Sequence, residues 1–155
     1  MPNPDHSLSK KFWCAVAAAV VFVAVSYPDV YNKTSWATSQ MSDNYPTIEG
    51  NCPTPSGKFI HSALFFAISY FLMKLCASQG YLRMDPKDDG VMARYAFTGT
   101  LLFFVIASSD TYKLTGSLVD GLADANGCPL TKGVLVHALV FMVVLILMMY
   151  FPKDC

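Results

Sequence analysis

Two stretches of this 155-residue chain repeat one phrase: CPTPSGKFIHSALFF at residues 52–66 and CPLTKGVLVHALVFM at residues 128–142. Both read C-P-x-x-x-G-x-x-x-H-x-x-x-F. A shift of 76 residues superimposes these stretches and the residues that follow them without a gap, and gives six identities. The identical pairs are Cys52 and Cys128, Pro53 and Pro129, Gly57 and Gly133, His61 and His137, Phe65 and Phe141, and Met73 and Met149.

A second pattern, D-x-Y-x-x-T, precedes each phrase and recurs at an offset of 81 residues. Its members are Asp29, Tyr31 and Thr34 in the first copy, and Asp110, Tyr112 and Thr115 in the second. In both copies the pattern follows an apolar run, and the C-P phrase leads into another. The five-residue change in offset is a difference in loop length, where insertions are tolerated. We infer that one segment has been duplicated in tandem.

The composition excludes an ordinary soluble domain. Hydrophobic residues make up 54% of the chain and charged residues 14%, against about 25% charged residues in a typical soluble domain. Four uncharged runs have no polar face to show to water, and flanking Lys and Arg side chains extend them toward the length of a membrane span. They are Phe12–Tyr27, Phe59–Met73, Tyr95–Ser109 and Val134–Phe151. A soluble bundle of buried helices is the alternative, and the first run also fits a signal peptide.

The sequence therefore predicts an all-α fold: an integral membrane four-helix bundle made of two tandem two-span repeats. The expected organisation is a polar N-terminus (1–10), a first repeat (11–76), a connecting loop (77–93), a second repeat (94–151) and a tail (152–155). Because each repeat has two spans, the repeats enter the bilayer in the same sense, related by an axis along the membrane normal.

The charged residues indicate the orientation of the chain in the membrane and do not suggest nucleic acid as a partner. Four spans place both termini on one side, where seven of the eleven Lys and Arg residues lie. The positive-inside rule then favours cytosolic termini. A formal net charge of zero gives no indication of nucleic-acid binding.

His61 and His137 are expected one turn inside the second span of each repeat, where an ionisable side chain faces protein or water and not lipid. Three interpretations stay open: a hydrogen-bonded structural network, a bis-histidine haem site, and a proton or ion path. The network is preferred, because no second histidine pair or compact metal-ligand cluster accompanies them, and no cofactor is expected. Its candidate partners for the imidazoles end the preceding spans: Asp29, Tyr31, Asp110 and Tyr112.

The residues around each histidine predict how the helix starts and which side faces inward. Pro53 and Pro129 suit an extended turn before helices that begin near Ser56 or Thr131, with these two residues as caps. On a helix, residues 57, 61, 65 and 72 form one stripe, and residues 133, 137, 141 and 148 repeat it. A glycine on such a stripe allows another helix to approach closely. We expect both stripes to face the interior.

The five cysteines include one equivalent pair. Cys52 and Cys128 lie on the same side, near the expected two-fold axis, where equivalent residues can meet. They form either a disulfide that ties the repeats together or two free, partly buried thiols. The absence of a C-x-x-C motif argues against a thiol oxidoreductase.

The remaining segments are polar connections without a recognisable catalytic motif, so the chain is not expected to be an enzyme. The connection from Pro28 to Gly57 contains Trp36 and several tyrosines, which suit either the membrane interface or a protein contact. In the second repeat, LVDGLAD at residues 118–124 is expected to form a short helix on the membrane surface.

The repeated phrase resembles a family. C-P-x-x-x-G-x-x-x-H-[SA], followed by an apolar span ending in LMK or LMMYFP and preceded by SYPDVY or SSDTY, looks like small multispanning membrane proteins of large DNA viruses of algae and protists. The resemblance covers most of residues 12–152. It implies an integral protein of the virion's internal membrane, beneath an icosahedral shell, similar in role to membrane-embedded minor capsid proteins. No catalytic residue of that family carries over.

Our leading hypothesis is therefore a structural viral membrane protein that links the internal bilayer to the capsid shell. Its partners would be the lipid bilayer and capsid or other virion proteins contacted through the loops, and a homo-oligomer is left open. The alternatives are a small channel or transporter and a haem redox protein that uses His61 and His137.

Overall fold

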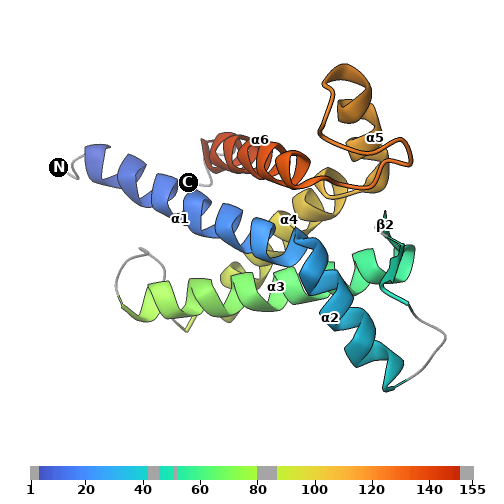
Figure 1. Cartoon of the computed structure of the whole chain (residues 1–155). Coiled ribbons are helices and arrows are strands. Elements are labelled where there is room, and N and C mark those ends of the chain that lie inside the picture. Colours follow the sequence, from blue (N-terminus) through green and yellow to red (C-terminus); the bar gives the residue numbers. More distant parts are fainter. Residues whose placement is uncertain (1–3, 42–45, 51, 80–86, 151–155) are drawn as a thin grey trace.

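The computed structural model describes residues 4–41, 46–50, 52–79 and 87–150 and shows a mostly helical, all-α protein, as predicted (Figure 1). One short antiparallel hairpin pairs β1 with β2. The elements are α1 (Pro4–Ser26), α2 (Pro28–Ser39), β1 (Ile48–Glu49), β2 (Cys52–Pro53), α3 (Pro55–Ser78), α4 (Asp89–Ile106), α5 (Ser109–Leu118) and α6 (Thr131–Tyr150).

Among the described residues, three helices are long and apolar enough to cross a membrane: α3, α4 and the Thr131–Met149 part of α6. The helix pair α1–α2, bent by 58°, makes a fourth if the pair is one span. The chain is thus compatible with a multi-pass membrane protein. Its exposed apolar side chains along these helices, such as Phe71, Val105 and Leu139, suit a lipid surround.

Each of α1 and α4 ends at a break that the local sequence explains. Pro28 opens α2, and a proline keeps the preceding residue, Tyr27, in an extended conformation. In the second half, the Ser108 side chain accepts a hydrogen bond from the Thr111 backbone N–H and so caps α5. The second helix of each half therefore begins at an equivalent position, Pro28 in α2 and Ser109 in α5, by a different local device.

Three expectations about the connections are corrected. The connection from Pro28 to Gly57 is not all loop, because the D-x-Y-x-x-T pattern of the first half lies in α2, as that of the second half lies in α5. The segment LVDGLAD is not a helix, because α5 ends at Leu118 and Gly121 adopts a positive φ of 85°. The connecting region is shorter than 77–93, since α3 continues to Ser78 and α4 begins at Asp89, capped by the Asp88 side chain.

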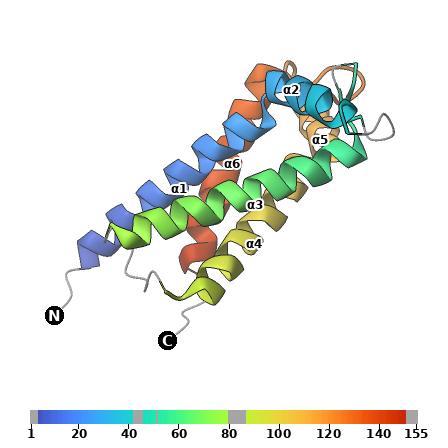
Figure 2. The ribbon, with the colours of Figure 1, turned by 90° about the horizontal axis from the view of Figure 1, so that it is seen from below.

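The long helices pack mainly across the two halves of the chain. The most extensive contacts join α1 to α6 and α3 to α4, while α1 with α3 and α4 with α6 touch less. Figure 2 shows this arrangement, with α1 beginning and α6 ending at the same end of the molecule. A hydrogen bond from Lys11 Nζ to the Met149 carbonyl oxygen, 3.3 Å long, joins the two helices there.

Four phenylalanines form the centre of the core. Phe22 and Phe103 are equivalent at the offset of 81, and Phe65 and Phe141 at the offset of 76. All four are at most 1% exposed. Ring centroids lie 5.2 Å apart for 22–103, 5.1 Å for 22–141, 4.6 Å for 65–103 and 5.7 Å for 65–141. Each ring therefore packs on its own equivalent and on one ring of the other pair, at distances favourable for aromatic contacts.

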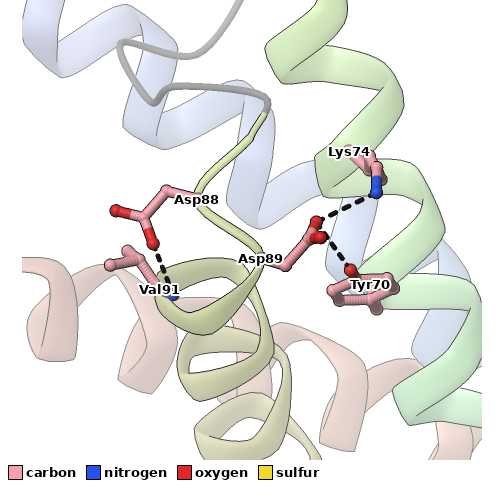
Figure 3. Close-up of polar contacts among 5 residues, drawn as sticks. All are labelled: Tyr70, Lys74, Asp88, Asp89 and Val91. Carbon is pink, nitrogen blue, oxygen red and sulfur yellow. Dashed lines mark hydrogen bonds and ion pairs between the residues drawn. The ribbon is translucent and has the colours of Figure 1, made fainter.

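A polar contact joins α3 to α4 at the end opposite α2 and α5. Asp89 accepts hydrogen bonds from the Tyr70 hydroxyl and from Lys74 Nζ, each 2.9 Å long (Figure 3). Asp88 beside it accepts the backbone N–H of Val91 at 3.2 Å. These side chains are exposed, so the contact fixes where the two helices meet more than it stabilises the fold.

Candidate functional site

His61 is fully buried and hydrogen-bonded at both ring nitrogens. Its Nδ1 lies 2.7 Å from the Val25 carbonyl oxygen, in the last turn of α1, and because a carbonyl only accepts, Nδ1 carries the proton. Its Nε2 lies 2.8 Å from Thr34 Oγ1 in α2. The Thr34 hydroxyl donates to this nitrogen when the ring is neutral, and otherwise to the Tyr31 carbonyl oxygen 3.0 Å away. The Tyr31 ring stacks on the imidazole at 3.5 Å between centroids and 4° between planes. We name Val25, Tyr31, Thr34 and His61 the first clasp.

The second half repeats the same contacts. His137 is 2% exposed; its Nδ1 lies 2.9 Å from the Ile106 carbonyl oxygen, and its Nε2 lies 2.8 Å from Thr115 Oγ1. The Tyr112 ring stacks on it at 4.0 Å and 3°. We name Ile106, Tyr112, Thr115 and His137 the second clasp. Residues that recur in the sequence at fixed offsets thus make the same side-chain contacts in both halves.

Each clasp provides a hydrogen-bond partner for a backbone carbonyl group at the end of a helix. The last carbonyls of an α-helix have no partner within the helix, and in an apolar surround such groups cost several kcal/mol if left unpaired. Val25 and Ile106 stand at the ends of α1 and α4. The imidazole caps these carbonyls and at the same time binds the next helix through the threonine. One side chain therefore joins three helices.

The sequence identified the right segment but not all of the partners. Tyr31 and Tyr112 contact the imidazoles, through their rings and not through their hydroxyls. Asp29 and Asp110 instead lie exposed in the first turns of α2 and α5, where an acidic residue favours the helix dipole. The two hydrogen-bond donors that were missed are Thr34 and Thr115. Their recurrence at the same offset as the tyrosines was the signal that pointed to them.

The hydroxyl group of Tyr112, in the short helix α5, differs from the other groups of the second clasp. Its hydroxyl is buried and has no hydrogen-bond partner within the described part of the chain. Burial raises the pKa of this phenol above its usual range, because the charged phenolate is poorly solvated there. The side chain therefore acts as a neutral ring stacked on His137.

The repeated glycines allow the backbone before each helix to come close. A Cβ on Gly57 would overlap the Thr47 carbonyl oxygen, and a Cβ on Gly133 would overlap that of Leu122. The same two carbonyls accept the backbone N–H groups of Thr54 and Leu130, both at 3.1 Å. The sequence predicted another helix as the close neighbour of both glycines, but their nearest neighbours belong to a folded-back segment.

The prolines and the caps complete this turn. Pro53 pairs with Ile48 in the β1–β2 hairpin, and Pro129 pairs with Ala123 in an isolated bridge. Helix α3 begins at Pro55, and its cap is Thr54 and not Ser56: Thr54 Oγ1 accepts the Gly57 N–H at 3.0 Å. The Thr54 hydroxyl also donates to the Pro46 carbonyl oxygen.

The inward stripes follow the expectation except at one position. The glycine, histidine and phenylalanine of both stripes are buried, and Leu72 packs against the core. Met148, its counterpart in α6, is 40% exposed. The second stripe therefore leaves the interior before the last turn of α6.

Cys52 and Cys128 form a disulfide, with their Cα atoms 4.7 Å apart. It joins the segments that precede α3 and α6, at the end of the molecule that carries α2 and α5. Cys14 and Cys76 are free thiols of intermediate exposure. The disulfide therefore links the two halves at the clasp end, whereas helix packing joins them along their length.

Replacing Cys52 and Cys128 together by serine should lower the free energy of unfolding by about 2 kcal/mol. This value lies at the low end of disulfide contributions, because membrane helices already restrict the unfolded chain. Thermal unfolding in detergent, with and without reductant, measures the loss. The double variant should show no further loss on reduction; equal sensitivity of variant and parent to reductant would contradict the assignment.

The hydrogen bonds of the two clasps argue against a haem site at the histidines. Both nitrogens of each imidazole are engaged, so a metal ligand role would require breaking a buried hydrogen bond to Thr34 or Thr115. Within the described ranges, no group of three or more His, Cys, Asp or Glu residues is placed to hold a metal ion. The residues present do not fit a haem without rearrangement.

Comparisons with family models, with curated proteins and with solved structures find no match for this chain.

Proposed function

We propose that this chain is a structural, multi-pass membrane protein: a four-helix bundle of two tandem two-span repeats that links the internal membrane of a virus particle to its capsid shell. The observation that carries the structural role is the pair of clasps. All four imidazole nitrogens are used to bind helices to one another. The residues that the sequence repeats most faithfully therefore serve architecture. The viral setting rests on the resemblance of the repeated phrase.

The bundle and repeat assignments are supported by equivalences at fixed offsets. The clasps, the central phenylalanines and the glycine contacts each occur once per half. The pairing of α1 with α6 and of α4 with α3 is what a two-fold relation between the halves requires. An axis along the membrane normal follows, because both halves begin at the same end of the bundle.

The disulfide adds a second argument for the orientation. Disulfides form and persist in oxidising compartments, and this one lies at the α2 and α5 end, opposite the start of α1. The excess of Lys and Arg at the other end independently favours the cytosol. We therefore assign the termini to the cytosolic side during synthesis and the clasp end to the opposite side.

A channel or transporter is the second candidate, and one observation speaks for it. Ser26 and Ser62 carry buried hydroxyls with no partner among the described residues, close in sequence to Val25 and His61 of the first clasp. The small pocket at Ser62 is also lined by Tyr31, Phe103 and Ala107. It leaves no room for a water molecule, so we rank transport second.

Cross-linking mass spectrometry on intact particles tests the proposal. An amine-reactive reagent should link this chain to shell proteins through lysines at one end of the bundle. The clasp end offers Lys33, Lys58, Lys113 and Lys132, and the opposite end offers Lys87. The end that carries the links shows which face meets the shell.

A matched variant makes the result specific. If the links come from the clasp end, Lys33→Arg and Lys113→Arg keep the charge, remove the reactive amine and should abolish the links from these two sites. Links confined to this chain, or to metabolic membrane enzymes, would overturn the structural assignment. Flux through reconstituted vesicles that depends on His61 would favour the transporter instead.

A further inference from the structure

Helix α5 has an exposed apolar edge that the fold does not use. Leu114 and Leu118 are one turn apart and are 65% and 78% exposed, and Val119 after them is 55% exposed. The opposite face of the same helix carries Tyr112, which is buried in the second clasp. Lys113 lies between the two faces and is exposed. The helix is thus amphipathic, with its second apolar edge unpartnered within the described structure.

The first half provides an internal comparison. At the offset of 81, Lys33 and Ala37 of α2 occupy the positions of Leu114 and Leu118. Both helices hold the same clasp geometry, with a stacked tyrosine and a bonded threonine. The leucines are therefore not needed to build a clasp. The leucines give α5 an exposed apolar edge that α2 lacks.

The position of α5 indicates what covers this edge. The helix begins three residues after α4 ends at Ile106, and Figure 1 shows it turning aside from the long helices at that end. The outer side of α4 carries Leu101 and Val105, which are 52% and 61% exposed and face lipid if α4 is a span. The exposed apolar edge of α5 thus follows, after a short break, a helix whose own exposed side is apolar.

We propose that α5 lies in the boundary between headgroups and acyl chains of the bilayer, with Leu114, Leu118 and Val119 inserted, and that α2 does not insert. In this arrangement α1 forms the first span without α2. This inference rests on the proposed role as a membrane-spanning protein. Amphipathic helices bind this boundary through an apolar face, with basic residues beside it that reach the headgroups, and Lys113 is such a residue. A lipid surface suits the edge better than a protein does, because α5 begins three residues after a helix that is itself a candidate span with exposed apolar side chains.

The two halves would then have different roles at the clasp end. The second half holds the clasp end against the membrane, and α2, with Lys33 and the 69%-exposed Trp36, stays available to water or to a protein partner. The duplication would then have produced one lipid-anchoring helix and one contact helix on the same scaffold.

Spin-label depth measurements at equivalent positions test this directly. Leu118→Cys and Ala37→Cys are labelled in a chain in which Cys14, Cys76 and Cys155 are serine and the disulfide is intact, reconstituted in phosphatidylcholine–phosphatidylglycerol vesicles. Collision rates with oxygen, which partitions into lipid, and with a water-soluble nickel chelate give the depth. We expect a higher oxygen-to-chelate ratio at position 118 than at position 37.

A third label separates failure of the inference from failure of the proposed function. Leu139→Cys lies on the exposed side of α6, where residue 139 is 59% exposed. If this label is reached by the chelate, the helix does not span the membrane and the proposed function fails. If it lies in lipid while position 118 is reached by the chelate, or is shielded from both reagents by protein, the inference alone is wrong. Equal ratios at positions 118 and 37 would also overturn it.

Discussion

Replacing Gly57 by alanine is expected to destabilise the fold by about 3 kcal/mol, near the upper end of typical overpacking costs. The new methyl group would overlap the carbonyl oxygen of Thr47 and would also come within 2.8 Å of the carbonyl carbon. These are backbone atoms, and the carbonyl oxygen accepts the Thr54 N–H. Relief therefore requires the folded-back segment to leave α3. Gly133→Ala should have a comparable effect through Leu122.

Gly99→Ala is the matched control for this prediction. Gly99 also lies inside a long helix and is buried, but its added Cβ would be 3.8 Å from Phe65 Cε1, an ordinary contact. Alanine is better than glycine in a helix interior by about 1 kcal/mol, so this variant should be unchanged or more stable. Unfolding in detergent, followed by circular dichroism, compares the stability of the parent protein with that of Gly57→Ala and of Gly99→Ala. Equal stability of Gly57→Ala and Gly99→Ala would contradict the close approach of Thr47.

Replacing His61 by alanine should cost about 4 kcal/mol. The change removes two buried hydrogen bonds, leaves the Val25 carbonyl without its imidazole partner and opens a cavity beside Tyr31. A buried polar group without a partner costs about 1–3 kcal/mol, and the cavity adds to this. His137→Ala should behave alike, because the second clasp has the same geometry.

A smaller change in the same clasp tests whether the cost comes from these contacts. Thr34→Val keeps the shape of the side chain and removes only the hydroxyl that bonds His61 Nε2, so its cost should be about 1 kcal/mol. The double variant should cost no more than His61→Ala alone, since the threonine then has no imidazole to bind. Additive losses would show that the two side chains act independently. A fully stable His61→Ala protein would contradict the structural role of the clasp.

The sequence by itself indicated a helical protein with several apolar helices that could span a membrane, and it identified the residues that recur at two fixed offsets. Four apolar runs with few charges predict helices that avoid water, and the two offsets identify equivalent residues such as His61 and His137 without any structure. The stripe of period 3.6 correctly places Gly57 and Phe65 on the buried side. These properties are local or periodic, so they can be recognised along a single chain.

Only the tertiary structure decided which atoms meet. The sequence suggested aspartates as imidazole partners, but the bend between α1 and α2 turns Asp29 outward and brings Thr34 to His61. It left open whether Cys52 and Cys128 meet, and it gave no sign that the halves pack α1 on α6 and α3 on α4. Such contacts depend on the angle at each helix break and on the relative position of distant segments. No pattern within one segment encodes them, because they arise when two segments satisfy each other's unpaired groups.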